Sequence, residues 1–360
     1  MMFSVNRPLF LLSAVLALAS FSSAQRSAPE ARPALWTFES SGTSVNLHAI
    51  RALSGGLAWV SGANGTILHT EDDGKTWQAC PAPSDGQGLD FRAIQAFDGT
   101  TILAMSSGKG NLSRLYKSVD GCAHWRLLYV NPASGGYWDV MRFIDNEYGY
   151  LVGDPVGGQF VLLDTKDGGE SWTLEAETEL ISRQGVIPAS NSALAADPDW
   201  GIRFGTSGPG EADVLSTTLA AQTRVLGTWR RVRVPIAGTT ASQGIASLDF
   251  RDASRGVAVG GDFAHPEVPA QTAAWTDDGG QHWTASKNPP HGYRSAVQWN
   301  DEIQAYIAVG PNGADISYDD GRSWTSIGSD NWTALGLPWV VGPGGRIAKI
   351  DLDQLRKKKR

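Results

Sequence analysis

The chain has 360 residues, among them 42 glycines and 14 tryptophans, with a charged fraction of 19% and a formal net charge of −7. A hydrophobic fraction of 41% excludes a disordered chain, the glycines follow no collagen period, and the acidic balance argues against a nucleic-acid partner. Many glycines with many tryptophans indicate tight turns between strands that bury aromatic rings.

Residues 1–24 have the features of a secretory signal peptide. Arg7 supplies the positive charge, an apolar stretch begins at Leu9, and Ser22 and Ala24 are the small residues before a cleavage site. The apolar stretch is shorter than the about 20 residues of a transmembrane helix. We therefore expect cleavage near Ala24, export to the periplasm or the extracellular space, and no transmembrane segment in the mature chain. An uncleaved anchor is the alternative.

Five segments share a Ser or Thr, an Asp two residues later and a Trp five residues after the Asp; their aspartates are Asp72, Asp120, Asp167, Asp278 and Asp319. The short carboxylate can accept hydrogen bonds from the amides of its own turn, and the glycine that follows tolerates positive φ. This motif is the Asp-box, a turn between two antiparallel strands. Because the aspartates repeat, we predict a structural role for them. In the second copy Cys122 replaces the usual glycine, and we expect Gly121 to take over the turn.

The tryptophans that end the repeats recur roughly every 40 to 60 residues; they are Trp36, Trp77, Trp125, Trp172, Trp229, Trp283 and Trp324. The residues after the last of these and those before the first add up to one further repeat. The sequence thus predicts an all-β fold, a seven-bladed β-propeller of four-stranded antiparallel blades, with the last blade closed by the N-terminal strand. Six or eight blades are the alternatives. One domain would span residues 25–355, a basic tail would follow at residues 356–360, and we expect a monomer.

The repeat pattern covers nearly the whole mature chain and resembles the sialidase-type (BNR) repeat superfamily. More closely, it is similar to bacterial relatives of the photosystem II stability and assembly factor, the YCF48-related proteins that are often labelled oxidoreductases. The resemblance rests on residues 157–169 and on the shorter segments 89–92, 154–158, 189–191, 260–263 and 292–297. It implies a propeller that acts as a binding or assembly module.

Polar residues that break the repeat form the candidate site. Alignment of the starts of the innermost strands, with the loops between second and third strands, selects His48, Arg92, Asp139, Asp154, Asn191, Asp262, Tyr293 and Arg294. We expect these residues to converge on one mouth of the central channel, since opposite charges in a concave mouth are typical of a ligand site. Arg92 and Arg294 would donate to an anion, and Asp139 and Asp262 would accept. A salt-bridged channel that only holds the blades together is the alternative.

Catalytic and cofactor motifs are missing from the sequence, including Gly-x-Gly-x-x-Gly, His-Glu-x-x-His and Gly-x-Ser-x-Gly. We therefore predict no metal, no cofactor and a binding function, with a protein partner or a carbohydrate or small anionic ligand. Glycoside hydrolysis is the enzymatic alternative, with Asp139 facing Asp154 or Asp262. A sialidase is less favoured because its Arg-Ile-Pro signature is missing. Whether Cys80 and Cys122 form a disulfide stays open, because they fall at different points of their repeats.

Overall fold

The structure is a computed structural model that describes residues 1–2, 34–175, 182, 184–220 and 224–358. The predicted signal peptide lies outside the described residues apart from Met1 and Met2, so its cleavage and the export of the chain stay predictions. All of the described strands belong to one compact unit that begins at Leu35. Among the described residues, no helix is long and apolar enough to span a membrane.

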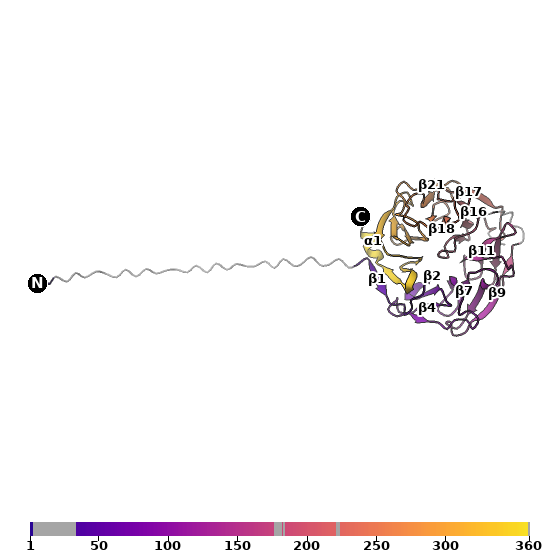
Figure 1. The fold of residues 1–360 in the computed structure, drawn as a ribbon, viewed down its shortest axis with the longest axis horizontal. Coiled ribbons are helices and arrows are strands. Elements are labelled where there is room, and N and C mark those ends of the chain that lie inside the picture. The colour runs from indigo at the N-terminus through magenta and orange to yellow at the C-terminus, as the bar shows by residue number, and fades with distance from the viewer. Residues whose placement is uncertain (3–33, 176–181, 183, 221–223, 359–360) are drawn as a thin grey trace. The chain divides into compact units, whose positions relative to one another are not determined.

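Seven four-stranded antiparallel sheets stand in a ring, as Figure 1 shows, and this confirms the predicted seven-bladed propeller. Blades 1 to 3 are formed by β2 (Leu47–Ala52), β3 (Ala58–Gly62), β4 (Ile67–Thr70) and β5 (Gln78–Ala79); β6 (Phe91–Ala96), β7 (Ile102–Ser106), β8 (Arg114–Ser118) and β9 (Arg126–Val130); and β10 (Trp138–Phe143), β11 (Gly149–Val156), β12 (Gln159–Thr165) and β13 (Thr173–Leu174). Blades 4 and 5 are formed by β14 (Leu194–Asp197), β15 (Gly201–Gly205), β16 (Asp213–Thr217) and β17 (Arg230–Arg233); and β18 (Gln243–Phe250), β19 (Gly256–Asp262), β20 (Ala273–Thr276) and β21 (Thr284–Ala285). Blade 6 is formed by β22 (Ala296–Asn300), β23 (Ala305–Gly310), β24 (Gly313–Ser317) and β25 (Thr325–Gly328), and blade 7 by β26 (Ala334–Gly336), β27 (Trp339–Val341), β28 (Ile347–Ile350) and β1 (Trp36–Glu39). The described helical segments are η1 (Ser54–Gly56), η2 (Gly110–Leu112), η3 (Pro343–Gly345) and α1 (Leu352–Lys358).

Blade 7 is closed by the N-terminal strand, as the sequence predicts. β1 pairs antiparallel with β28, and Trp36 lies opposite Ile350. The Trp36 ring stacks on Trp332 at 5.5 Å between ring centroids, and its Nε1 donates to the carbonyl oxygen of Ile327 at 3.0 Å. The two ends of the chain therefore complete one sheet, and this pairing protects the edge of β28. Helix α1 follows β28, so the predicted basic tail begins inside a helix, at Arg356, where the guanidinium contacts Glu302.

The apolar core lies between neighbouring blades. One buried cluster joins blades 1 and 2, another joins blades 6 and 7, and each blade contributes alternate side chains of its inner strands. Inner strands such as β3 and β7 are buried along their whole length because both of their faces are covered by other blades. This explains why the strands read as short runs of Val, Ile, Leu and Ala.

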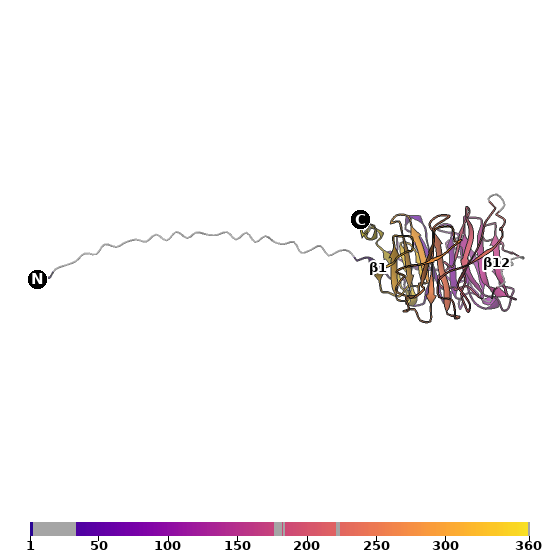
Figure 2. The same ribbon diagram turned by 90° about the horizontal axis from the view of Figure 1, so that it is seen from above.

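The antiparallel order of the strands gives the propeller two distinct faces. The strands run roughly along the axis of the ring, which is visible in the edge-on view of Figure 2. We call the face on which the innermost strands begin the start face, and the opposite one the end face. Loops between second and third strands lie on the start face, and the Asp-containing turns between third and fourth strands lie on the end face.

The five repeated aspartates each hold their own turn. In every copy the Ser or Thr hydroxyl donates to the aspartate Oδ1 at 2.8–2.9 Å, and the amide four residues after the aspartate donates to the same oxygen at 2.9–3.0 Å. These hydrogen bonds lower the pKa of Asp120, which reaches about 2. The carboxylates are thus engaged within the turns, far along the blades from the channel.

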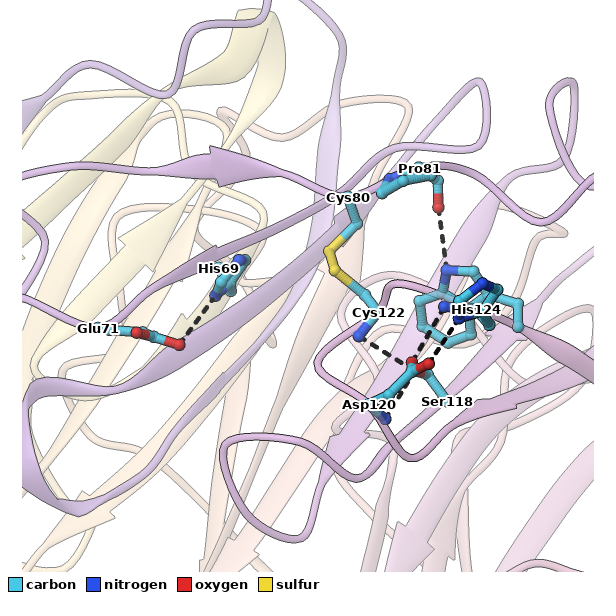
Figure 3. Close-up of a disulfide and its surroundings, with 9 residues drawn as sticks. His69, Glu71, Cys80, Pro81, Ser118, Asp120, Cys122 and His124 are labelled. Carbon is cyan, nitrogen blue, oxygen red and sulfur yellow. Dashed lines mark hydrogen bonds and ion pairs between the residues drawn. A yellow bond between two sulfur atoms is a disulfide. The ribbon is translucent and has the colours of Figure 1, made fainter.

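A disulfide joins Cys80, just after β5, to Cys122 in the turn of blade 2 (Figure 3). The Cα atoms of the two residues are 5.8 Å apart, and the bond settles the question that the sequence leaves open. Gly121 and Cys122 both adopt a φ of 68°. Gly121 therefore does not replace the missing glycine alone, and the cysteine itself takes a conformation that side chains disfavour.

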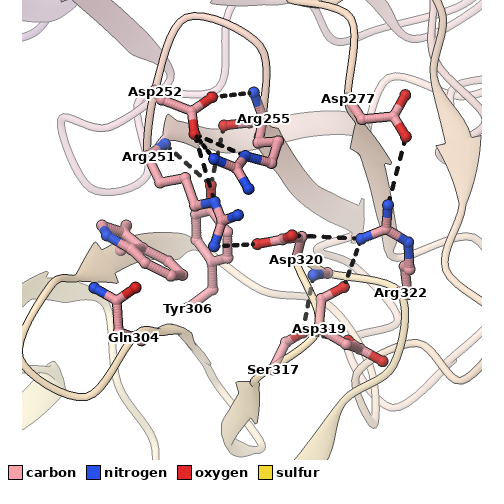
Figure 4. A network of polar contacts seen from close by, with 12 residues as sticks. Arg251, Asp252, Arg255, Asp277, Gln304, Tyr306, Ser317, Asp319, Asp320 and Arg322 are labelled. Atoms are coloured by element: carbon pink, nitrogen blue, oxygen red, sulfur yellow. Dashed lines mark hydrogen bonds and ion pairs between the residues drawn. The ribbon is translucent and has the colours of Figure 1, made fainter.

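Ion pairs connect blades 5 and 6 on the end face, as Figure 4 shows. Arg251 pairs with Asp320 at 2.9 Å, and Arg322 reaches Asp277 at 3.5 Å. These contacts lie beside the turn of Asp319 and hold its blade against the preceding one. The pair of Arg322 and Asp277 is exposed, so its contribution to stability is small, whereas the pair of Arg251 and Asp320 is mostly buried.

Candidate functional site

Four blades carry a β-bulge at the start of the innermost strand. The pairing shifts register between Leu47 and Ala49 and at the matching places in blades 2, 3 and 5. A bulge inserts one residue into the strand and redirects a side chain out of the regular alternation. The inserted residues are His48, Arg92, Asp139 and Ala246. Three of the predicted site residues therefore occupy bulges.

Asp90 joins two of the predicted residues into one charged group. His48 Nε2 lies 2.9 Å from one carboxylate oxygen of Asp90, and Arg92 Nε lies 2.8 Å from the other. Burial alone would raise the pKa of Asp90, but the hydrogen bond from His48 and the charge of Arg92 hold it below its ordinary value. The carboxylate is therefore ionised and bridges blades 1 and 2. Its place directly before β6, two residues ahead of an arginine, is the sequence signal that the repeat alignment overlooks.

Asp139 is a buried acid without a partner. It is 1% exposed, and neither of its carboxyl oxygens has a hydrogen-bond partner among the described residues. Burial and the nearby carboxylate of Asp154 raise the pKa of Asp139 well above its usual value, which favours the protonated acid. Burial also raises the pKa of Asp154, whose Oδ1 accepts the amide of Val186 at 3.1 Å. The charges of Arg92, Asp139 and Asp154 all act on Tyr137. The two acids therefore lie close to the charged group that Asp90 forms with His48 and Arg92.

Residues 185–192 form a central segment that crosses the channel. Its carbonyl at Pro188 accepts Arg92 Nη1 from blade 2 at 2.8 Å, and Ser190 Oγ donates to the carbonyl of Ser295 in blade 6 at 2.6 Å. Ser192 Oγ donates to Ser247 Oγ of blade 5 at 2.7 Å. Contacts to blades on opposite sides of the ring place this segment on the axis, where it separates the start-face mouth from the rest of the channel.

Asn191 belongs to this central segment. The innermost strand of blade 4 begins only at Leu194, later than the alignment of the repeats expects. Asn191 adopts a φ of 59°, and its Oδ1 accepts the amide of Met141 at 2.8 Å. It thus ties the segment to blade 3 and does not lie with His48 at the start of a strand.

Arg294 is held inside blade 6. Its side chain is 1% exposed, and Nε donates to Asp315 at 2.7 Å while Nη1 donates to Asn312 at 2.6 Å. His291 Nδ1 lies 2.7 Å from the other oxygen of Asp315. A guanidinium whose N–H groups are already engaged in this way is a poor hydrogen-bond donor to an anion at the mouth. Burial also lowers the pKa of Arg294, which disfavours its charged form further. Asp315 carries no signal in the sequence beyond its place in a third strand.

Tyr293 and Asp262 line the same side of the start face. Tyr293 is buried against Ile187 and Ala246, and its ring meets Phe263 edge-on at 6.3 Å between centroids. Asp262 accepts Gln243 Nε2 at 3.1 Å and stands apart from the acids of blade 3. The structure therefore brings His48, Arg92, Asp139 and Asp154 together, and it leaves Asn191, Asp262, Tyr293 and Arg294 in other surroundings.

One group of potential metal ligands comes together in the described ranges. A nitrogen of His69 and the sulfurs of Cys80 and Cys122 lie within 4.8 Å of one another. Because the sulfurs are joined in the disulfide, they offer no thiolate to a metal ion. On the start face, by contrast, Asp90, His48 and Arg92 lie together with two acids whose pKa values are raised, Asp139 and Asp154, and this set suits polar contacts with a partner.

Comparison with known proteins shows similarity at the level of the fold. No family model matches the chain, and no curated protein matches it by sequence. The structure of YCF48 bound to D1 peptide is similar over 90% of this chain and 99% of that one, with a TM-score of 0.61 and 16% identity. YCF48 from Cyanidioschyzon merolae is similar over 89% of this chain and 100% of that one, with a TM-score of 0.58 and 16% identity. The Neurospora crassa Pan2 WD40 domain follows with a TM-score of 0.53, 12% identity and coverage of 87% and 94%. These neighbours have the β-propeller fold in common with this chain.

Proposed function

We propose that this chain is an exported Asp-box propeller that binds a protein partner on its start face. The observation that carries the proposal is a rim of exposed apolar side chains around the closed, polar centre of that face. The rim residues lie in loops or hairpins between second and third strands; they are Leu112, Val156, Phe263 and Val268. Protein interfaces combine apolar contacts with satisfied polar groups in this way.

The polar centre suits recognition better than chemistry. The central segment closes the mouth, and Asp90 is already paired with His48 and Arg92. Such a surface offers a partner a fixed pattern of charge, which gives specificity more than affinity. Among the structural neighbours, YCF48 is described with a bound D1 peptide. This supports a peptide or protein as the class of partner.

Glycoside hydrolysis fits the same residues poorly. A glycosidase needs one protonated and one ionised carboxyl group, both within reach of the sugar. Asp139 is 1% exposed, and burial raises the pKa of both Asp139 and Asp154. We therefore propose that these acids maintain the mouth and do not act on a substrate.

Export is proposed from the signal sequence and is supported by the disulfide. Disulfides persist in oxidising compartments and are rare in the cytosol. N-terminal sequencing of the protein purified from its native compartment tests the proposal, with Gln25 expected as the first residue. A mature chain that still begins with Met1 would contradict it.

The docking surface is tested with a pair of matched variants. Cross-linking followed by mass spectrometry identifies the partner, and biolayer interferometry with the purified partner then gives affinities. We expect Phe263→Ser to weaken binding at least tenfold, about 1.4 kcal/mol. Val119→Ser, at an even more exposed apolar position in the Asp-box turn on the end face, is the control and should bind normally. Equal losses in both variants, or cross-links confined to the end face, would overturn the proposal. A panel of glycosides tested for turnover addresses the enzymatic alternative.

A further inference from the structure

A second polar site lies in the channel, on the other side of the central segment. A cavity of about 150 Å³ is bounded by the ends of the innermost strands and by residues 190–192. Its polar lining consists of Arg51, Gln95, Arg142, Asn191, Asp249 and Gln298, with Ser190 and Ser192. A volume of this size holds about ten water-sized atoms, enough for a small ion and too little for an oligosaccharide.

Two arginines of the lining form no direct ion pair with the described residues, and the charge of Arg142 acts on the carboxyl group of Asp249 across the cavity. Arg51 and Arg142 occupy the same place, near the ends of β2 and β10, and neither forms a hydrogen bond or ion pair with any residue in the described part of the chain. Nε of Arg51 is buried and has no partner. Arg294, by comparison, places its guanidinium on Asp315 and Asn312. Arg51 as a whole is half-buried, and a buried donor without a partner such as its Nε favours a ligand that accepts from it.

The charge of Arg142 acts directly on Arg51. Burial and this like charge together lower the pKa of Arg51 to about 10. Two guanidinium groups repel each other across a cavity, and an anion bound between them offsets this repulsion because it attracts both. The protein therefore holds a small positive region within a chain of negative net charge.

Asp249, the acid of the cavity, forms no ion pair with either arginine and is held by the main chain instead. Asp249 accepts the amide of Trp299 with one oxygen at 2.7 Å and that of Phe250 with the other at 3.0 Å. Burial raises the pKa of Asp249, and these two hydrogen bonds and the charge of Arg142 offset that effect only in part. The lining of the cavity thus holds two arginines and one carboxyl group whose oxygens already accept main-chain amides.

Two amide side chains add neutral donors. The main-chain amide of Leu337 donates to Gln298 Oε1 at 3.1 Å, and that of Met141 donates to Asn191 Oδ1 at 2.8 Å. These contacts require the oxygen of each side-chain amide to face the main chain, so the NH₂ group is left to donate elsewhere. The cavity therefore offers guanidinium and amide donors together, the set that binds oxyanions in proteins.

We propose that this cavity binds a small oxyanion, of the phosphate or short-chain carboxylate class, between Arg51 and Arg142. The ligand would accept hydrogen bonds from both guanidinium groups and from Gln298 and Asn191. Because Asn191 is part of the central segment, the bound anion would also stabilise the element that closes the start-face mouth.

Isothermal titration calorimetry with the mature protein tests the proposal, using sodium phosphate and sodium succinate in separate titrations at matched ionic strength. We expect at least one of the two anions to bind with one-to-one stoichiometry, and which of them binds distinguishes the phosphate source from the carboxylate source. Arg142→Gln and Arg51→Gln should each weaken binding at least tenfold, because each removes a charge-assisted contact. Arg230→Gln removes the same charge from the exposed outer strand β17 and should bind as the wild type does.

The proposal is overturned if neither anion binds the wild type at about 10 mM ligand, a concentration that corresponds to a binding free energy of ~2.7 kcal/mol. It is also overturned if the affinity of Arg142→Gln is unchanged, or if Arg230→Gln loses as much affinity as the cavity variants do. If Arg51→Gln fails to fold, the half-exposed Arg142 variant and the wild-type titration still decide the question. A melting temperature that rises with the anion in the wild type, and stays constant in Arg142→Gln, is the second expected readout.

Discussion

The cross-link between blades 1 and 2 allows a stability prediction whose size follows from the structure. Cys80 and Cys122 are separated by 42 residues, and a disulfide that closes a loop of this length restricts the unfolded chain by about 4 kcal/mol. A unit of roughly 325 residues melts with an entropy of about 0.7 kcal/mol/K, so the loss corresponds to a Tm lower by about 6 °C. We expect this shift in Cys80→Ser/Cys122→Ser and in the reduced wild type.

A second variant separates the cross-link from the backbone of the turn. Cys122 has a φ of 68°, a left-handed conformation that costs a non-glycine residue about 1–2 kcal/mol. Cys80→Ser/Cys122→Gly loses the same bond but relieves this strain, so it should melt about 1.5–3 °C above the double serine variant.

Differential scanning calorimetry with and without a phosphine reductant measures both effects, and a thiol count at each temperature confirms the state of the cysteines. The double serine variant serves as its own control, because the reductant should leave its Tm unchanged. If the fully reduced wild type melts at the temperature of the oxidised protein, the reasoning from chain entropy is refuted.

Three further predictions concern blade closure, the buried acid and the Asp turns. Deletion of residues 34–40 removes β1 and exposes the edge of β28, so circular dichroism and size-exclusion chromatography should show unfolding or association; a stable monomer would contradict the closure. The pKa of Asp139 is raised in the folded state, so its contribution to stability is present below about pH 4 and is lost as the pH rises through the folded pKa, at about 1.4 kcal/mol per unit. Asp139→Asn should therefore gain stability relative to the wild type at neutral pH, and parallel pH profiles of the free energy of unfolding would argue against a perturbed acid. Asp167→Ala removes acceptors for the hydroxyls of Thr165 and Ser171, and it should cost about 1–2 kcal/mol in urea denaturation while partner binding stays intact.

Much of the fold could be predicted because the contacts that define its turns join residues close together in the sequence. The hydrogen bonds of an Asp turn, such as those from Thr165 and Ser171 to Asp167, join residues no more than four positions apart. This short pattern recurs in five of the seven blades, the tryptophans that end the repeats give the number of blades, and the remainder at the two ends predicts the pairing of β1 with β28. The identities of the inserted bulge residues at the channel could be read from the same alignment, because the bulges occupy equivalent places.

The composition of the sites was decided by tertiary contacts. The Ser190 hydroxyl meets a carbonyl 105 residues away, and Arg92 reaches a carbonyl 96 residues away; no repeat pattern encodes such contacts. Arg294 is bound by Asp315 and is therefore not available at the mouth. Arg51, in the regular part of a repeat, lies beside the cavity with its Nε unpaired. The amino-acid sequence by itself determined the scaffold, since turns and alternating strands depend on neighbours along the chain. Only the closed ring decided which charges meet, since the burial and pairing of a side chain at the axis depend on what the opposite blades supply.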